Sequence, residues 1–585
     1  MSTSSAIQVS SRKQSLWERI SSSQILASPW VVPTLLVVCV FLLRLPTALF
    51  PKELDPDESQ ALSDAMKFMI DPRPFIAVDG GSWGPLNSYL ISIFLLMGFK
   101  ANFILAHMLA TCLMCLQVLT AYVTLRHIGS EKTAALGGVL MVAFYGLATH
   151  PNYLNYAGEL LPSLLTIAGF YAFVAWLDED PKRSRGVQLL LLFLAGFALG
   201  TAPWCKLQAA PITAGIGLVI VAAIFLAKDT PFNFSRSAVE LLAFGWGGVL
   251  TTCIMLVTLL ACGAVRDFWY SYVQGNAAYA GTLNVDNGLI HVLVMLLMTP
   301  LQQFLLVGLC VLVYAALVGG PLVFSKKQAW ALSGIFVYTA AALVSVGRAP
   351  YPFLHHALFL VPPLTYLAVS VTCCNVNATP EDRHGRSMMI KGALALLLCG
   401  TAVLYLSYIV RYVHLVESAH HFAYSYSEST IRVPKATSVT GGVDLSFWAR
   451  RDSSERIAAV IRGLQKTYPV RSLELWGWAP AVYVLMQTPP ATREAIASPV
   501  GGPMDYYYRP RFLNDLREHP PDLFVDAVVP DLLKPDWTQS DGYESDPELR
   551  KFIEQNYVLV DQLTLVEGTK PVRFFARRAH IHQSP

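Results

Sequence analysis

Charged residues are scarce in this sequence. Asp, Glu, Lys and Arg make up only 14% of its 585 residues, and hydrophobic residues make up 54%. A soluble globular chain carries about 25% charged residues, and the deficit here is largest before residue 412. This excludes a soluble protein for the first two-thirds of the chain and predicts a membrane protein there. The net charge of +3 is too small to indicate a nucleic-acid partner.

Cysteine is absent from the last third of the sequence. All ten cysteines lie between Cys39 and Cys399, so an extracytoplasmic region after residue 412 would not be held by disulfides. Cys112 and Cys115 have the CxxC spacing, but they lie in an apolar segment without a second pair, which argues against a metal or redox site. The region after 412 also lacks a glycine-rich phosphate loop.

Long hydrophobic runs dominate what is present. Because a membrane helix needs about 20 apolar residues, the sequence predicts about 11 or 12 such helices. One candidate is broken near Pro300. The candidate segments are 30–50, 85–99, 101–125, 133–149, 154–177, 187–202, 207–227, 238–262, 290–319, 328–346, 355–373 and 391–411.

Lys and Arg between these segments predict the orientation, because they favour the cytoplasmic side. They place residues 1–28 on the cytoplasmic side of an inner membrane. The loop 51–84 and everything after residue 412 are placed on the outer side. One segment too many then precedes the loop 263–289, so the short segment 85–99 is expected not to cross fully. The predicted protein is a multi-pass membrane protein with a cytoplasmic N-terminus.

Residues 413–585 are expected to form a separate extracytoplasmic α/β domain, after a multi-spanning domain at 29–412. Charged residues return here, and apolar residues recur with mixed periodicity. The pattern predicts helices at 454–466, 512–518 and 547–555, and strands at 473–478, 523–529, 557–563 and 571–576. The fold class is therefore a polytopic all-α membrane protein with a C-terminal α/β domain.

Acids and bases gather in the segments predicted to lie outside. The loop 51–84 carries Asp57 and Glu58, and later segments add further ionisable residues. These are Glu159, Lys206, Arg348 and His355. Ionisable residues at membrane depth are costly and mark functional sites. A carboxylate can take a proton from an acceptor hydroxyl, and cations can stabilise an anionic leaving group such as a phosphate.

Each of these residues also has a structural explanation. Asp55 and Pro56 are typical of the first positions of a helix, which makes Asp55 a cap and favours acids in the turn that follows. Glu159 could likewise be a first-turn acid, and Lys206 could extend to the membrane surface. Adjacent histidines on a helix point about 100° apart, so His355 and His356 are not expected to share a metal.

The ordered set of motifs resembles the GT-C membrane glycosyltransferases, in particular bacterial relatives of protein O-mannosyltransferases and of the lipid A aminoarabinose transferase. The resemblance covers roughly residues 30–410, with one further motif in the C-terminal domain. The matching segments are Asp57-Glu58, Gly84-Pro85-Leu86, the stretch 156–162 around Glu159, Lys206, Gly347-Arg348 with His355, and the Trp-Gly-Trp segment 475–483. The chain departs from the family where it has His356 in place of a tyrosine, Val346 in place of a glycine, and leucine after Lys206.

The resemblance implies sugar transfer, with inversion, from a polyprenyl-phosphate donor to an envelope lipid, glycan or protein. Asp57 would be the general base, and Glu58 and Glu159 would orient the acceptor. Lys206, Arg348 and His355 would bind the donor phosphate. Some members of the family use a divalent cation, for which Asp57 and Glu159 would be the candidate ligands.

Two other classes of function stay open at this point. A transporter or flippase of a lipid-linked or small-molecule substrate would also be polytopic, although transporters tend to contain inverted repeats and this sequence has none. A non-catalytic envelope-assembly protein would instead depend on residues 413–585. Counterflow without sugar transfer would favour the transporter. Loss of function on truncation near residue 412, with Asp57→Asn still functional, would favour the assembly protein.

Overall fold

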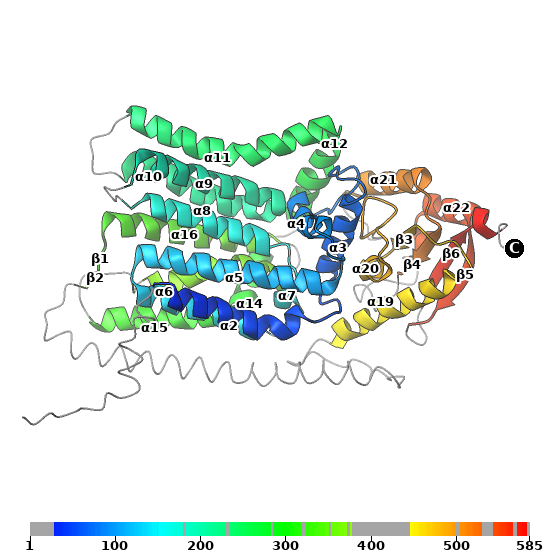
Figure 1. Cartoon of the computed structure of the whole chain (residues 1–585), viewed down its shortest axis with the longest axis horizontal. Coiled ribbons are helices and arrows are strands. Elements are labelled where there is room, and N and C mark those ends of the chain that lie inside the picture. Colours follow the sequence, from blue (N-terminus) through cyan, green and yellow to red (C-terminus); the bar gives the residue numbers. More distant parts are fainter. Residues whose placement is uncertain are drawn as a thin grey trace, which may run out of the picture.

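The computed structural model describes residues 29–376 and 445–581. Short gaps within these ranges fall at 149, 179–182, 228–233, 282–284, 319–321, 350–352, 371, 373–374, 498–503, 529–541 and 566–569. The predicted segment 391–411 lies outside the described residues. The described chain forms an elongated helical bundle with an α/β domain packed at one end (Figure 1).

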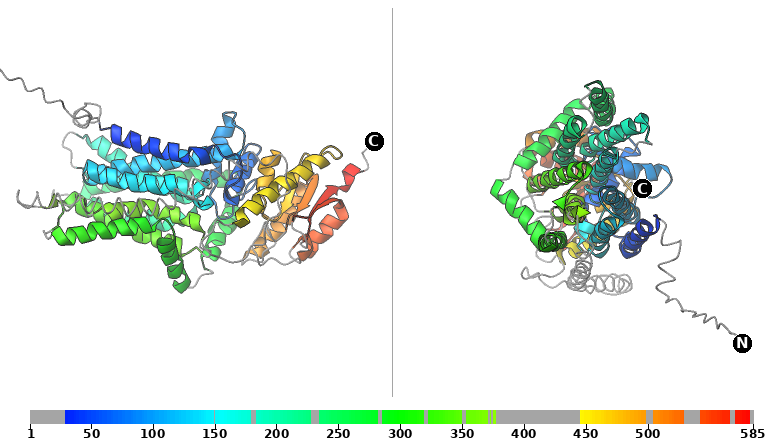
Figure 2. Two further views of the ribbon diagram at one scale, coloured as in Figure 1. Left: turned by 90° about the horizontal axis from the view of Figure 1, so that it is seen from below. Right: turned by 90° about the vertical axis from the view of Figure 1, so that its left-hand side faces the viewer.

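The bundle consists of long apolar helices that run side by side and are seen nearly end-on along the long axis (Figure 2). Its first half contains α2 (Val31–Ala48), α5 (Phe103–Ile128), α6 (Glu131–Leu147), α7 (Pro151–Leu154), α8 (Leu160–Trp176) and α9 (Arg185–Cys205). Its second half contains η1 (Leu207–Ala209), α10 (Ala210–Leu226), α11 (Phe234–Ala261), α14 (Val285–Met298), α15 (Gln302–Val318), α16 (Lys326–Gly347), η3 (Leu354–Phe359) and α17 (Val361–Ser370).

Six helices in the described part of the chain are long and apolar enough to cross a membrane, and a bent pair could form a seventh span. That pair, α14 and α15, bends by 77° near Pro300, where the sequence predicts a break. The predicted segments 133–149, 154–177 and 355–373 form shorter helices. The protein is thus a multi-pass membrane protein, as its composition indicates.

Helices α9 and α11 pack through glycines. A Cβ on Gly200 would lie 2.0 Å from the carbonyl oxygen of Gly248, and one on Gly247 would lie 2.0 Å from that of Phe193. Small residues allow membrane helices to approach at backbone distance. Here they draw α11 against α9, the helix that ends directly before Lys206.

Two short helices connect the bundle to the α/β domain. Helix α3 (Pro56–Phe68) begins with Asp55 as its N-cap, whose carboxylate accepts the N–H of Asp57, so the predicted cap is confirmed. Helix α4 (Pro85–Leu96) is 12 residues long. At 1.5 Å per residue this is about 18 Å, too short for a hydrocarbon core of about 30 Å. Helix α4 lies in the segment 85–99, which the distribution of Lys and Arg predicts not to cross the membrane fully. The remaining short helices of this region are α12 (Val265–Asp267), η2 (Phe268–Gly275) and α13 (Asn276–Gly281).

The C-terminal region contains a four-stranded mixed sheet with the order β3-β4-β6-β5. Strands β3 and β4 are parallel and the other pairs are antiparallel. The predicted α/β class is confirmed, and β5 has the predicted bounds. The strands are β3 (Leu473–Trp476), β4 (Leu523–Asp526), β5 (Tyr557–Leu563) and β6 (Val572–Arg577). The helices are α19 (Leu445–Leu464), α20 (Ala481–Met486), α21 (Asp505–Glu518), η7 (Tyr543–Ser545), α22 (Pro547–Asn556) and α23 (Arg578–Ile581), and a further two-stranded ladder joins β1 (Leu322–Val323) to β2 (Asn375–Val376).

Buried charges join this domain to the loop that precedes α4. Arg511 on α21 forms an ion pair of 2.6 Å with Asp79, and both side chains are almost fully buried. The N–H of Asp79 donates to the carbonyl of Arg493 at 2.8 Å, and Arg493 donates to the carbonyl of Phe75 at 3.1 Å. The C-terminal domain therefore fixes the loop that leads into the start of α4.

Replacing Arg511 with Met is expected to lower the unfolding free energy by about 3–5 kcal/mol, the usual cost of removing one partner of a buried ion pair. The variant would leave Asp79 and Glu494 without their shared cation. Thermal unfolding of the purified proteins measures the effect. The matched control is Arg550→Met, because Arg550 pairs with Glu554 on the exposed surface of α22 and should change stability by at most about 1 kcal/mol. Equal stability of the two variants would contradict the prediction.

Candidate active site

Five ionisable side chains from four separate segments converge at the end of the bundle that meets the C-terminal domain. His355 Nε2 lies 3.8 Å from Asp57 Oδ2 and 3.9 Å from Glu159 Oε1. His356 Nε2 lies 3.8 Å from the same Glu159 oxygen, and Lys206 Nζ lies 2.6 Å from it. The sequence-predicted residues Asp57, Glu159, Lys206 and His355 thus belong to one cluster.

The ion pair between Glu159 and Lys206 forms the buried part of this cluster. The Glu159 side chain is fully buried and that of Lys206 is 6% exposed. Lys206 directly follows the last residue of α9 in an extended conformation, and its ammonium lies 5.7 Å from the ring centroid of Trp83. Glu159 precedes α8 but makes no capping hydrogen bond. Its carboxylate therefore pairs with Lys206 and does not cap the helix.

Asp57 is the more accessible carboxylate of the cluster, with 19% of its side chain exposed. Burial raises the pKa of Asp57 to about 6; the positive charge of Lys206 opposes the shift, and the negative charges of Glu159 and Glu58 add to it. A carboxyl group with this pKa is largely deprotonated at neutral pH and is a stronger base than an exposed aspartate. Such a group is suited to accept a proton.

Glu58 differs from its neighbour in both exposure and bonding. Its side chain is fully buried and lies 3.0 Å from His107 Nε2. It also accepts the backbone N–H of Leu54 at 2.5 Å and that of Tyr156 at 3.3 Å. Both carboxylate oxygens are used within the protein, so Glu58 holds α3 against α5 and the segment before α8. This position does not suit the substrate contact that the family resemblance implies for it.

The two histidines approach the same carboxylate oxygen, contrary to the expectation that their rings diverge. They lie on a 3-10 helix, their ring centroids are 4.6 Å apart, and the ring planes are nearly perpendicular. Both Nε2 atoms nevertheless lie within 3.9 Å of Glu159 Oε1. The buried Nδ1 atoms of His355 and His356 have no hydrogen-bond partner among the described residues, which leaves them available to a bound group.

Two groups of side chains contain ligand types suited to a divalent cation: Glu159 with His355 and His356, and Asp55 with Asp57 and His355. In the first group, the Lys206 ammonium is bonded to the oxygen that both imidazoles approach, so a metal ion there would be repelled by it. In the second group, Asp55 already accepts the N–H of Asp57 and the amide of Asn152. Neither group, as placed, fits a resident metal ion, and no step below uses one.

Like Glu58, Arg348 is a predicted site residue that the cluster does not include. It follows α16, its side chain is exposed, and no polar contact joins it to the cluster within the described ranges. Sequence reasoning in turn missed His107 and Trp83. His107 is an ionisable residue within an apolar helix, a pattern that itself indicates a structural or functional contact. Trp83 gave no signal beyond its place beside Gly84.

Known proteins resemble this chain in fold and not in sequence. No family model matches the sequence, and no curated protein matches it significantly. ArnT from Cupriavidus metallidurans bound to undecaprenyl phosphate superimposes with a TM-score of 0.54 at 13% identity, covering 94% of this chain and 98% of ArnT. Its apo state gives a TM-score of 0.53 at 13% identity, with the same coverage. The chain therefore has the fold of the GT-C membrane glycosyltransferases, which its sequence motifs resemble.

Proposed function

We propose that this protein transfers a sugar from a polyprenyl-phosphate donor to a hydroxyl group of an envelope lipid, glycan or protein, on the outer face of the inner membrane. The observation that carries the proposal is the contact of Asp57, Glu159, Lys206 and His355 within one cluster. The ArnT structure that shares the fold contains undecaprenyl phosphate, which supports a polyprenyl-phosphate donor.

In this proposal the acceptor oxygen attacks the anomeric carbon as Asp57 takes the hydroxyl proton. The bond between that carbon and the phosphate oxygen breaks, and its electron pair leaves with the polyprenyl phosphate. A single displacement of this kind inverts the anomeric centre. Lys206 stabilises the phosphate as its negative charge grows, and Glu159 holds the ammonium in position. His355 donates to the phosphate or to the acceptor, and Arg348 stays a predicted phosphate ligand.

The direct test uses the purified full-length protein with synthetic undecaprenyl-phosphate donors that carry different hexoses and pentoses, together with an envelope lipid extract as acceptor. Release of undecaprenyl phosphate, followed by mass spectrometry, is the expected result for at least one donor. Counterflow of a lipid-linked substrate across proteoliposomes, without any such release, would instead favour a transporter.

The rate of this reaction is expected to rise with pH through about 6 and to level off near neutral pH. Only the deprotonated form of Asp57 accepts a proton, and the pKa of Asp57 is raised to about 6. A tenfold loss of rate is therefore expected for each pH unit well below this value. Initial rates between pH 5 and 8 provide the measurement. A rate that stays constant down to pH 5 would argue against Asp57 as the base.

A further inference from the structure

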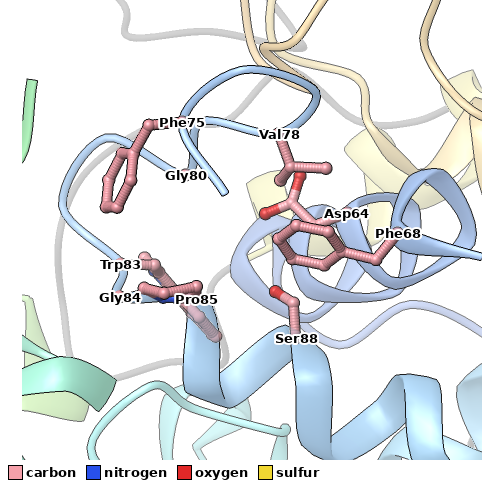
Figure 3. Close-up of a pocket in the computed structure, with 9 residues that line it drawn as sticks. All are labelled: Asp64, Phe68, Phe75, Val78, Gly80, Trp83, Gly84, Pro85 and Ser88. Atoms are coloured by element: carbon pink, nitrogen blue, oxygen red, sulfur yellow. The ribbon is translucent and has the colours of Figure 1, made fainter. Parts of the chain in front are cut away.

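A separate pocket lies between α3, the loop after it and α4 (Figure 3). Its enclosed space of about 10 Å³ has room for one water-sized group, and the wider space of about 230 Å³ includes open solvent. Phe68, Phe75 and Trp83 supply aromatic walls, and Asp64 and Ser88 supply polar groups. A space of this size admits a single hydroxyl group and not a whole sugar ring.

Asp64 is the unusual member of this pocket. The residue is 2% exposed, and its Oδ1 atom has no hydrogen-bond partner among the described residues. Burial and the negative charge of Asp79 raise the pKa of Asp64 well above its usual value, and Ser88 opposes this only in part. The raised pKa favours the neutral carboxylic acid, and the free Oδ1 atom can pair with a bound hydroxyl group. An unsatisfied buried polar group is costly, and a bound polar group would satisfy it.

Trp83 connects the pocket with the proposed active site. Its ring lies 5.7 Å from Lys206 Nζ, and a Cβ on Gly158 would lie 3.1 Å from it. The next residue, Gly84, donates its N–H to the carbonyl of Cys205 at 2.8 Å, and a Cβ there would lie 1.9 Å from the carbonyl oxygen of Trp204. The pocket wall is thus fixed against the segment that carries Lys206.

We propose that this pocket binds a hydroxyl-bearing group of the donor's glycosyl unit, with Asp64 and Ser88 as its polar contacts and Trp83 as its apolar wall. The inference rests on the proposed function, in which Lys206 holds the donor phosphate. The glycosyl unit is bonded directly to that phosphate. With the phosphate at Lys206, the glycosyl unit is therefore the part of the donor that would lie against Trp83. Asp64 thereby becomes a determinant of sugar specificity, distinct from the catalytic base.

Ligand-induced thermal stabilisation tests this without any reaction, because a ligand that binds only the folded state stabilises it in proportion to its affinity. The probes are undecaprenyl phosphate and undecaprenyl-phosphate donors that carry a hexose or a pentose, with acceptor omitted. Wild-type protein should be stabilised by undecaprenyl phosphate and more strongly by at least one donor. Asp64→Leu should bind that donor about tenfold more weakly, as expected when a buried hydrogen bond is lost, and should bind undecaprenyl phosphate unchanged.

Asp64→Asn retains a donor group and the shape of the side chain, so it should lose less donor affinity than Asp64→Leu, and Ser88→Ala should fall between wild type and Asp64→Leu. If Asp64→Leu does not fold, the Asn and Ala variants must still show the selective loss. Equal donor affinity in all variants, or equal loss for both probes, would overturn the subsite. Wild-type protein that responds to undecaprenyl phosphate but gains nothing from any glycosyl unit would overturn the subsite alone. No response to any of these lipids would overturn the proposed donor class, and the subsite with it.

Discussion

Asp57→Asn is expected to slow the release of polyprenyl phosphate by about 10²–10⁴-fold, the usual contribution of a general base. The amide keeps the size of the side chain but cannot accept the acceptor's proton. The loss should appear in kcat, with little change in KM for the donor, because the base acts only in the transition state. The protein should remain folded, since the cap of α3 is Asp55 and not Asp57.

The matched control for this experiment is Asp71→Asn in the same loop. Asp71 pairs with Arg73, whose side chain is 52% exposed, and exposed ion pairs contribute at most about 1 kcal/mol to stability. The control should therefore retain wild-type rate and unfolding temperature. Full activity of Asp57→Asn beside an active Asp71→Asn would refute the assignment of the base.

Local features of this chain could be predicted from the sequence because short-range physics decides them. Asp55 and Pro56 form a helix start through contacts within three residues, and the short apolar run 557–560 favours a strand at β5. Six long apolar helices are recognisable from composition alone. The grouping of Asp57, Glu159 and Lys206 was predicted by resemblance, since no local rule relates residues this far apart.

The remaining features depend on how distant segments pack. The buried contact between Glu58 and His107 gives Glu58 a structural position, and no pattern around Glu58 reveals this. His355 and His356 converge on one oxygen from a 3-10 helix, which an argument from α-helix geometry does not describe. The exposure of Arg348 likewise follows from where α16 ends, a boundary that sequence patterns place only approximately.

Lys206→Met is expected to produce the second large effect, a loss of at least about 10²-fold in kcat/KM, typical of removing one group that stabilises transition-state charge. The same change leaves the Glu159 carboxylate buried without its cation, so a stability loss of about 3–5 kcal/mol should accompany it. A loss of activity in this variant alone could therefore reflect poor folding. Stability and rate have to be measured separately, by thermal unfolding and by release of polyprenyl phosphate.

The double variant Lys206→Met with Glu159→Gln separates the two roles. With both charges removed, no buried charge is left unpaired, so most of the lost stability should return. The rate should stay low, because the phosphate still lacks its cation. Lys132→Met, at an exposed lysine in the first turn of α6, provides the control and should behave as wild type. If the double variant regained both stability and wild-type rate, the ion pair would be a structural element only, and the donor phosphate would have to be held by other residues.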